Sequence, residues 1–406
     1  MTTQEVYENL LRDAVSIYSK EGLKEKLESG RRLKIKLGAD PSRPDLHLGH
    51  SVVLRKLRML QDLGHEIVFV IGDFTAMIRD PTGRSKTRVP LTFEQTRENS
   101  RSYYEQVTKI LDKDKTRITY NSEWLSKMNF ADVLALAGKY TVARILERDD
   151  FAKRYAEKAP IGMHEMFYPL MQGYDSVALK ADLELGGSAD FISMLEAGAE
   201  EISEEDMLAA MAFGRELQRD YGQTPQEVIT FPLLPGLDGV EKMSKSLDNY
   251  IGIDEPADIM YEKCMKVPDA LLLSYFNLTT DLPESAYASL VRGDIRQAHF
   301  LYAATIVRLY HGEEAVAAAE ARYRSVAAGG VPENMESLTA EPGALLTELL
   351  VRSGLAPSRS EARRLMTGGG VKLDGTPVKD PTAVLADKGE YILSKGKNKF
   401  VRIVIA

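Results

Sequence analysis

The alternation of apolar and polar positions predicts an α/β fold for roughly the first 250 residues. Short apolar runs at 33–39 and 66–75 have the length of buried strands, and residues 48–62 between them carry leucines at helical spacing. Strand, helix and strand in this order predict two parallel strands joined by a crossover helix. Further runs of the same kind, separated by helical stretches, extend the prediction to an open parallel sheet with helices on both faces. They lie at 117–121, 177–186 and 228–234.

The remaining chain is predicted to be mainly helical until a second small α/β unit begins. Residues 1–32 have the pattern of a charged helical lead-in, and 253–328 are helical again. After a Gly- and Pro-containing linker, Ser358 and Glu361 have the spacing of a capping box that starts a helix, and three glycines from 368 end it. Short strands are expected at 371–373, 391–393 and 400–405.

Composition narrows the class of protein. With 406 residues, 44% hydrophobic and 28% charged, the chain is long enough for two or three domains with real cores. No apolar run is long enough to span a bilayer, and the N-terminus lacks the pattern of a signal peptide, so we expect a cytoplasmic protein without membrane association. Cys264 is the single cysteine, which predicts neither disulfides nor a structural zinc site.

Charge is unevenly distributed along the chain. The formal net charge is −8, yet residues 344–406 contain 11 Lys and Arg against 6 Asp and Glu. The basic C-terminal part is therefore where we expect a polyanion to bind.

Two histidines mark the first candidate site. His47 and His50 lie where the apolar run 33–39 has passed through a turn rich in Gly and Pro and the helix 48–62 begins. A helix start directs backbone N–H groups at an anion, and Gly49 removes the Cβ that would keep a nucleotide away. The two imidazoles can donate hydrogen bonds to phosphate oxygens.

A second motif, Lys242-Met-Ser-Lys245-Ser246, follows 195 residues after His47. It places two cations three residues apart on a loop, able to stabilise negative charge that develops on a departing pyrophosphate. Each motif alone is also compatible with an ordinary polar helix start or a solvated loop. Their combination predicts ATP chemistry.

The two motifs resemble the HIGH and KMSKS signatures of class I aminoacyl-tRNA synthetases. From about Val6 to Ala406 the chain resembles the longer type of bacterial tyrosyl-tRNA synthetase. This resemblance implies a Rossmann-like catalytic domain at 1–252 with a helical insertion at about 130–160 that carries part of a dimer interface. It further implies a helical anticodon-side domain at 253–330, a linker at 331–343 and an S4 RNA-binding domain at 344–406.

The resemblance also implies the reaction: a tyrosine–tRNA ligase, in which the tyrosine carboxylate attacks the α-phosphorus of ATP and the aminoacyl group then passes to tRNA(Tyr). No side-chain nucleophile is needed, so positioning and charge stabilisation carry the catalysis. Magnesium is expected to accompany the ATP substrate, without a metal bound by the protein itself. We expect a cytoplasmic homodimer. The catalytic candidates are His47, His50, Lys242 and Lys245, and the ATP-binding candidates are these four with Gly38, Asp40, Gly49 and Gly187.

An enzyme that selects tyrosine over phenylalanine needs a hydrogen-bonding group at the bottom of an aromatic slot. By resemblance, Asp175 takes the phenolic hydroxyl, while Tyr168 and Gln172, on the same helical face, hold the ammonium group. Thr75 and Asp80 match positions that also line the amino-acid site. Asn121, counted with the tyrosine-binding residues, and Trp124 match positions behind the phenol-binding Asp175. The expected RNA-binding residues are Arg359, Arg363, Arg364 and Lys372.

The chain departs from the family after Gly187. The family continues with Thr or Ser and then Asp-Gln, of which the Asp contacts the ATP ribose and the Gln lies near the reacting carboxylate. Here an acidic segment, 188–213, takes that place. A catalytically weak RNA-binding paralogue is therefore an alternative function. A small-molecule nucleotidylyltransferase would generally lack the lysine motif joined to an S4 module, and a tryptophanyl-tRNA synthetase would place Asp175 against an indole.

Overall fold

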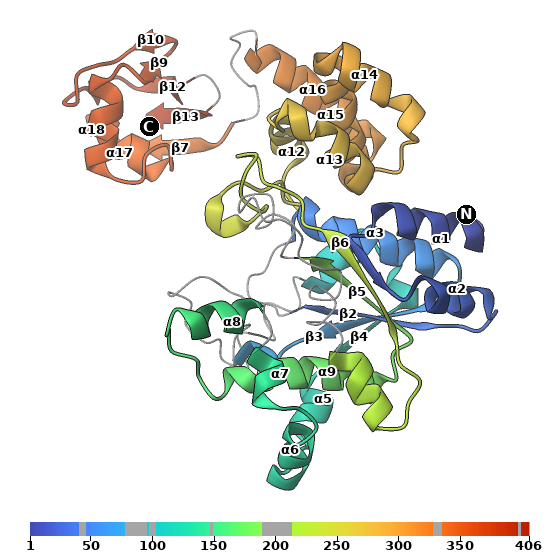
Figure 1. Ribbon diagram of the computed structural model, residues 1–406. Helices are drawn as coiled ribbons and strands as arrows, with labels where there is room; N and C mark the ends of the chain where they lie inside the picture. The colour runs from blue at the N-terminus through green and yellow to red at the C-terminus, as the bar shows by residue number, and fades with distance from the viewer. Residues whose placement is uncertain are drawn as a thin grey trace. The chain divides into compact units, whose positions relative to one another are not determined.

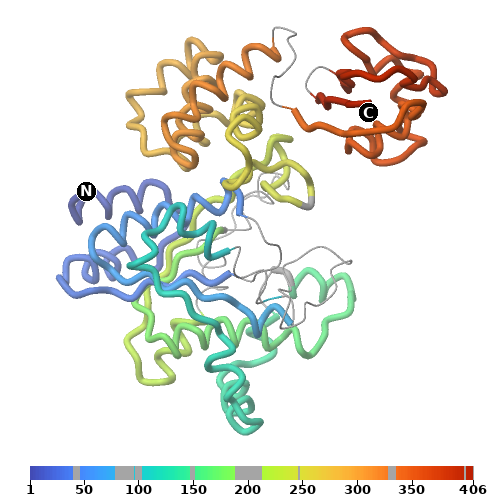
Figure 2. The backbone as a smooth tube through the Cα atoms, turned by 180° about the vertical axis from the view of Figure 1, so that it is seen from behind, coloured from blue at the N-terminus to red at the C-terminus, as the bar shows by residue number. Residues whose placement is uncertain are grey.

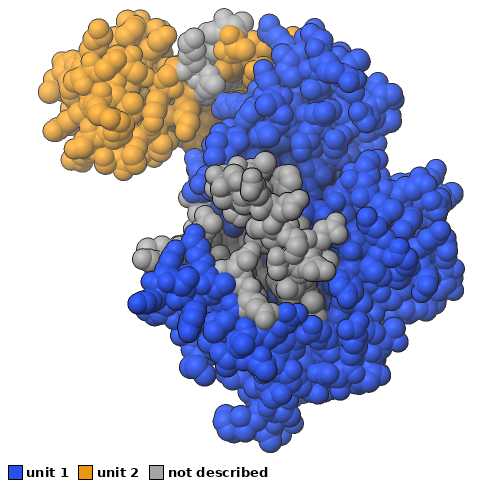
Figure 3. Space-filling model, in the orientation of Figure 1, with its two compact units in different colours: residues 1–256, 263–306 blue, residues 257–262, 307–406 orange. Residues whose placement is uncertain are grey.

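The computed structural model describes residues 1–39, 46–77, 96, 103–146, 149–188, 213–327, 335–396 and 399–405. The chain forms two compact units, coloured separately in Figure 3. Unit 1 consists of residues 1–256 and 263–306, and unit 2 of residues 257–262 and 307–406. The boundaries between the units fall at the start of or inside two helices, Ala257–Cys264 and Ile295–His311, and not at the ends of the four expected domain ranges. These ranges stay a prediction.

Unit 1 is built on a six-stranded sheet, which confirms the predicted α/β architecture (Figure 1). The strand order is β1-β6-β5-β2-β3-β4, and the five strands β2 to β6 are parallel to one another. Buried residues fill β3 and β6, as parallel strands covered on both faces require, whereas β4 at the edge of the sheet has a single buried residue, Thr119. The strands are β1 (Ser16–Tyr18), β2 (Lys34–Ala39), β3 (Glu66–Ile71), β4 (Thr116–Tyr120), β5 (Leu183–Ser188) and β6 (Glu227–Pro232).

Two details of the sequence prediction were wrong. The lead-in, expected to be only helical, contains strand β1, which pairs antiparallel with β6 and joins Ser16 to Thr230 through their hydroxyl groups at 2.6 Å. The apolar run predicted as a strand from Val177 begins inside a helix, and the strand itself starts at Leu183. Three residues are too few to show a strand period, and apolar runs in buried helices and strands look alike.

Helices cover both faces of the sheet (Figure 1). The predicted crossover helix is α3, whose Leu54, Leu57 and Leu60 are buried as their spacing requires. It shares one face with α1 and α2, while α5, α7 and α9 lie on the other. The bounds are α1 (Thr3–Asp13), α2 (Lys20–Glu28), α3 (Leu48–Asp62), α5 (Ser122–Leu125) and α9 (Tyr168–Leu179).

The expected insertion is helical where it is described. It contains α6 (Phe130–Ala137), α7 (Val142–Leu146) and α8 (Asp149–Ala156). Helix α6 projects away from the sheet in both views of the backbone (Figures 1 and 2). A capping box at Asn129 and Asp132 fixes the start of this helix.

Helices also follow the sheet, as predicted. Helix α13 packs against α3 within unit 1. On α13, the Phe276 ring stacks on that of Tyr287, which directly precedes α14, with ring centroids 4.4 Å apart. An ion pair between Arg55 and Asp281 joins the same two regions. The helices are α12 (Ala257–Cys264), α13 (Leu272–Thr279), α14 (Ala288–Gly293), α15 (Ile295–His311) and α16 (Glu313–Ala327).

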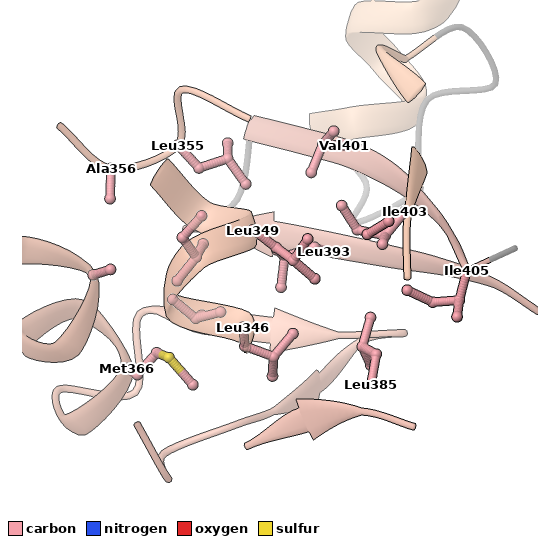
Figure 4. Packing of buried hydrophobic residues seen from close by; sticks show 14 residues of the cluster. Leu346, Leu349, Leu355, Ala356, Met366, Leu385, Leu393, Val401, Ile403 and Ile405 are labelled. Carbon is pink, nitrogen blue, oxygen red and sulfur yellow. The ribbon is translucent and has the colours of Figure 1, made fainter. Parts of the chain in front are cut away.

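The C-terminal part of unit 2 has its own sheet, in the order β10-β9-β12-β13-β7, and its own apolar core (Figure 4). Leu349, Leu393 and Ile403 meet in this core. Strand β7 falls within the range expected as linker and pairs in parallel with β13. The elements are β7 (Ser337–Ala340), β8 (Ala344–Leu345), α17 (Leu346–Arg352), α18 (Arg359–Thr367), β9 (Val371–Leu373), β10 (Thr376–Pro377), β11 (Val384–Leu385), β12 (Gly389–Lys395) and β13 (Lys399–Ile405).

The predicted boundaries of α18 are confirmed. The Ser358 hydroxyl accepts a hydrogen bond from the Glu361 N–H at 3.2 Å, and the helix ends at Thr367 with Gly368 as its C-cap. The following Gly369 has φ of +72°, a conformation that favours glycine. Across the part of the chain that the structure describes, no helix is both long and apolar enough to cross a membrane.

Candidate functional site

The carboxyl ends of β2, β3 and β4 lie side by side and carry the first candidate residues. The N–H of Gly72, after β3, donates to the carbonyl of Ala39 at 3.0 Å, and the N–H of Asn121, after β4, donates to that of Ile71 at 3.1 Å. Thr75 and Asn121 therefore leave the sheet at one edge, close to each other. In open parallel sheets this edge is where ligands bind.

The two histidines form a close pair at the start of α3. His47 is the N-cap residue, and the Nδ1 atom of His50 accepts a hydrogen bond from its backbone N–H at 3.2 Å. The ring centroids are 4.0 Å apart. Because Nδ1 of His50 is an acceptor, a neutral His50 ring carries its proton on Nε2, which leaves an N–H donor for a ligand.

Both imidazoles are neutral at pH 7. Burial, followed by the nearby His50 and Lys242, lowers the pKa of His47 far below its ordinary value. His50 keeps exposed surface but sits deep among surrounding atoms, and desolvation lowers its pKa to about 4. A cationic imidazole pair at 4.0 Å would repel itself, so the close spacing and the neutral state agree.

Gly49 has a structural role that its position alone did not reveal. A Cβ at this glycine would lie 3.0 Å from the imidazole ring of His47 and 3.7 Å from Cβ of Met243. The glycine therefore lets the His47 ring lie against the first turn of α3. The sequence predicts that Gly49 makes room for a nucleotide, and the contact with His47 is a second reason for a glycine at this position.

The lysine motif lies next to the histidines although 195 residues separate them. Residues that follow the motif pair with the start of α3, since the Leu48 N–H donates to the Ile251 carbonyl at 2.9 Å and the Ile253 N–H to the Leu46 carbonyl at 3.2 Å. Tyr250 stands between the motifs.

The Tyr250 ring centroid is 6.3 Å from that of His47 and 5.4 Å from Nζ of Lys245. The Lys242 charge is close enough to depress the pKa of His47. The structure thus brings the four candidate catalytic residues near one another, with two neutral imidazoles beside two ammonium groups.

One amide side chain shapes the lysine loop, defined here as residues 236–249. Oδ1 of the buried Asn249 accepts from the Ser244 N–H at 2.7 Å, and its Nδ2 donates to the Lys242 carbonyl at 3.1 Å and to the Asp238 carboxylate. Asp238 also accepts from two backbone N–H groups of the loop, each at 3.0 Å. Sequence reasoning missed Asp238 and Asn249, although both are loop-forming residue types near the lysines.

Asp175 lies on α9 as predicted, and its carboxylate is buried and bonded by two donors. Trp124 Nε1 donates to Oδ1 at 2.7 Å, and Asn121 Nδ2 approaches Oδ2 at 3.5 Å. Burial raises the pKa of Asp175 to about 7, against the lowering influence of Lys36 and the two donors. A carboxyl group whose pKa is raised in this way, at the sheet edge where ligands bind, is typical of a functional residue.

Asn121 connects the ends of three elements. Its Nδ2 also donates to the Thr75 hydroxyl at 3.1 Å, and its Oδ1 accepts from the Phe74 N–H at 3.0 Å. Thr75, Asn121 and Asp175 therefore lie in one hydrogen-bonded cluster. Tyr168 and Gln172, both on α9 with Asp175, complete the expected helical face.

Charged residues that the motif search did not select lie beneath this cluster. Nζ of Lys36 on β2 pairs with Oε1 of Glu184 on β5 at 2.9 Å, and the Lys36 side chain is 1% exposed. The signal in the sequence was a lysine and a glutamate inside apolar strands. It could not identify the pair, because strand order decides that β2 and β5 are neighbours.

Two of the expected site residues, Asp40 and Asp80, and most of the segment that follows Gly187, residues 189–212, lie outside the described residues. No described residue comes within 4 Å of a Cβ placed at Gly38, whereas a Cβ at Gly187 would lie 2.9 Å from a methyl group of Leu233. No group of three or more His, Cys, Asp or Glu that could hold a metal occurs among the described positions.

The expected RNA-binding residues are exposed on unit 2. Arg359 and Arg363 lie one helical turn apart on α18, and Lys372 is on β9. Arg359 pairs with Glu348 at 2.5 Å and Arg364 with Glu361 at 2.8 Å, but both arginines stay mostly exposed. Such surface pairs are weak and leave the guanidinium groups available to phosphates.

Comparisons with known proteins identify both parts of the chain. The family described as class I tRNA synthetases (W and Y) matches residues 28–203 and 205–327, and the S4 domain matches residues 346–383. The tyrosine–tRNA ligase of Deinococcus radiodurans is 49% identical over 408 residues, covering 98% of this chain and 95% of the relative. That of Moorella thermoacetica is 48% identical, covering 94% of this chain and 90% of the relative.

Solved structures share the fold at lower identity. A C-terminally truncated mitochondrial tyrosyl-tRNA synthetase of Aspergillus nidulans has a TM-score of 0.63 at 20% identity, covering 79% of this chain and 93% of that one. A tyrosyl-tRNA synthetase of Archaeoglobus fulgidus complexed with L-tyrosine has a TM-score of 0.60 at 22% identity, covering 78% of this chain and 100% of that one. Neither set of comparisons supports the alternative of a weak paralogue. The chain belongs to the tyrosine–tRNA ligase family of class I tRNA synthetases.

Proposed function

We propose that this site activates L-tyrosine with ATP and passes the tyrosyl group to tRNA(Tyr). The observation that carries the proposal is the meeting of the histidine pair and the lysine loop in the unit whose sheet edge also holds a buried Asp175. Neutral donors and cations suit a triphosphate, and a buried carboxylate suits a phenolic hydroxyl. Both substrates of the activation step, ATP and tyrosine, therefore have fitting residues in unit 1.

In this proposal His47 and His50 donate N–H groups to phosphate oxygens of ATP. Because the rings are neutral, they bind phosphate without the self-repulsion of two imidazolium ions. Lys242 and Lys245 stabilise the charge that develops on the α-phosphorus and on pyrophosphate as it leaves. The further ATP-binding residues are Gly38, Asp40, Gly49 and Gly187.

For tyrosine, Asp175 accepts the phenolic O–H while Trp124 and Asn121 hold the carboxylate in place. Tyr168 and Gln172 bind the ammonium group, and Thr75 and Asp80 line the site. Phenylalanine is rejected because it offers no O–H donor to the buried carboxylate, a loss of about 1–3 kcal/mol or more. The hydrogen bonds from Trp124 and Asn121 support this assignment.

Magnesium enters this scheme with ATP, because phosphate oxygens and water are the ligands it prefers. The ion would supply additional positive charge to the triphosphate. The protein's own part is to orient ATP through the histidines and lysines. For unit 2, Arg359, Arg363, Arg364 and Lys372 are the proposed tRNA contacts, through charge-assisted bonds to phosphates.

We also propose that the protein acts in the cytoplasm, where it charges tRNA, and that it is a homodimer. Apolar side chains on the insertion support the dimer: Phe130 is 76% exposed, Leu134 57% and Val142 55%. Phe130 and Leu134 are on the projecting helix α6, and exposed apolar residues on such an element favour association with a partner. The four ranges 1–252, 253–330, 331–343 and 344–406 remain our proposed domains.

The activation step is tested by exchange of pyrophosphate into ATP. We expect exchange that depends on tyrosine and that is reduced about 100-fold or more in Lys245→Ala, because a cation opposite developing charge is removed. Lys153→Ala, at an exposed lysine on α8, is the control and should retain activity. Exchange with tryptophan alone would disprove the assignment.

The dimer is tested by sedimentation equilibrium of the full chain. Phe130→Asp and Leu134→Asp together should convert a dimer into a monomer, since charged groups oppose burial at an apolar interface. The control Thr382→Asp, at an exposed position of unit 2, should leave the measured mass of the dimer unchanged. A monomeric wild-type protein at micromolar concentration would contradict the proposal.

A further inference from the structure

Two opposite charges face each other in the middle of the parallel sheet. Lys36 on β2 and Glu184 on β5 are direct partners in the register of these strands. Nζ and Oε1 lie 2.9 Å apart, and the two side chains are 1% and 6% exposed. Burying such a pair costs desolvation energy that two apolar residues of similar volume would not cost, so stability alone does not explain it.

Hydrogen bonds join this pair to the helix turn that carries Asp175. Nζ of Lys36 donates to the hydroxyl of Ser176 at 2.8 Å and to the carbonyl of Gln172 at 3.2 Å. With the bond to Glu184, all three donors of the ammonium group are used. The cation is therefore held in a fixed position beneath residues 172–176.

Glu184 is fixed as firmly as the lysine. Its second oxygen, Oε2, accepts from the Ser176 hydroxyl at 3.3 Å and from the side-chain amide of Gln226. Ser176 thus bridges the two charged groups on the helix side. The pair cannot turn toward solvent, and both charges act at fixed distance on their surroundings.

Two charged groups of the sheet act on the Asp175 carboxyl. Lys36 from β2 lowers its pKa, and Glu184 from β5 raises it, while burial raises it most. Trp124 and Asn121 contribute neutral donors from the far side. Asp73, the other buried carboxylate nearby, is bonded to the N–H and hydroxyl of Ser122 instead.

We propose that Lys36 and Glu184 are positioning residues that set the charge on Asp175 and thereby the pH range over which the site accepts a phenolic hydroxyl. The inference rests on the proposed role of Asp175 in binding tyrosine. Lys36 favours the carboxylate, which accepts the phenolic O–H. Glu184 reduces this influence, so that the two residues adjust it in opposite directions.

Substitutions of the two partners should shift the Asp175 titration in opposite directions. Lys36→Met removes the favourable cation and should raise the midpoint by about one pH unit or more, whereas Glu184→Gln leaves the cation uncompensated and should lower it. The double variant Lys36→Met/Glu184→Gln should fall between the single variants. It contains no unpaired buried charge, so it remains informative if Lys36→Met alone does not fold.

The titration can be read without enzymatic activity. Trp124 is the single tryptophan of the chain, and its Nε1–H donates to Asp175 at 2.7 Å. Its fluorescence, excited where tyrosine does not absorb, should therefore change with pH as Asp175 ionises. Asp175→Asn should abolish this transition, which identifies its origin.

A second lysine of the same strand provides a matched control. Nζ of Lys34 donates to the Leu179 carbonyl of α9 at 2.7 Å, at the end of the helix away from the Gln172 turn. Lys34→Met removes a similar bond between the same strand and the same helix. The midpoint of the fluorescence titration should stay at its wild-type value in this variant.

The effect on function is measured by the pH dependence of enzymatic activity. The pH dependence of kcat/KM for tyrosine in pyrophosphate exchange reports groups of the free enzyme. Its acidic limb should move with the fluorescence midpoint in each variant, upward for Lys36→Met and downward for Glu184→Gln. Titration of ATP and tyrosine themselves is common to all variants and cancels in the comparison.

Equal midpoints in wild type, Lys36→Met and Glu184→Gln, with folding verified by circular dichroism, would overturn the inference and leave the pair a structural feature. Shifts in the same direction for both variants would also overturn it. A wild-type protein without tyrosine-dependent exchange, but with the opposite fluorescence shifts, would refute the proposed function while supporting the control of Asp175 by the pair.

Discussion

At the scale of single residues, the candidate site was predictable wherever its geometry is local. Tyr168, Gln172 and Asp175 share a face because helical spacing dictates it, and the structure has a helix there. The link between Asp175 and Trp124 was suggested only by resemblance, since 51 residues separate them. Lys36 and Glu184 depend on which strands are neighbours, and the order of residues in the chain does not reveal this.

Replacing Asp175 tests selection of the substrate. Asp175→Asn should reduce kcat/KM for tyrosine about 10- to 100-fold, because a hydrogen bond to a charged acceptor contributes about 1.5–3 kcal/mol. The value for phenylalanine should change little, so the preference for tyrosine decreases. Both are measured by pyrophosphate exchange, with Asp220→Asn at an exposed position as control. An unchanged preference would contradict the role of Asp175.

At the scale of elements, hydrophobic period predicted the long segments and failed for short or ambiguous ones. Helix α3 and strands β2, β3 and β4 were located because their apolar residues repeat over several positions. Strand β1 was missed because its three residues obtain their structure from pairing with β6. The conformation of the lysine loop depends on tertiary hydrogen bonds to Asn249, and no local pattern encodes these.

Asn249 should affect catalysis through the position of the lysines. Asn249→Ala removes bonds to Ser244, Lys242 and Asp238, so we expect kcat for exchange to fall about 10- to 100-fold, as small displacements of catalytic groups do. KM for tyrosine should change much less. Leu247→Ala, at an exposed position of the same loop, is the control. A loss confined to tyrosine KM would argue against the positioning role.

Helix α9 requires a glycine where it meets the helical segment 213–220. A Cβ at Gly173 would lie 2.9 Å from a methyl group of Leu217 and 3.2 Å from the backbone of Phe213. Gly173→Ala should lower the free energy of unfolding by about 1–3 kcal/mol, as overpacked core substitutions do. Gly293→Ala, on α14 with open space around it, should be neutral or stabilising. Denaturant unfolding of the two variants measures the difference.

At the scale of the whole molecule, composition and charge predicted two parts with different partners. The basic C-terminal range has its own buried core, centred on Leu349, Leu393 and Ile403. Because this core is assembled from residues close in sequence, the S4-like part could be recognised from its capping signal and strand pattern. The division into compact units could not be predicted, since it depends on contacts of helices α12 and α15.

A double substitution in unit 2 should affect aminoacylation of tRNA without affecting tyrosine activation. Arg359→Ala/Arg363→Ala should lower kcat/KM for tRNA in aminoacylation and reduce the slope of log affinity against log salt by up to about two, because two phosphate contacts are lost. Pyrophosphate exchange should remain at the wild-type level. Lys388→Ala, exposed elsewhere in unit 2, is the control. A parallel fall in exchange would show that these arginines act on activation.

The backbone bonds from Leu48 to Ile251 and from Ile253 to Leu46 have a consequence for the energetics of the reaction. They tether the lysine loop at its exit to the helix that carries the histidines. Lys242 and Lys245 are therefore only a few residues along the chain from this attachment. In the proposed reaction, the attachment keeps the two cations at a high effective concentration beside the histidines, so that placing them on ATP costs little of the entropy that an untethered segment would lose.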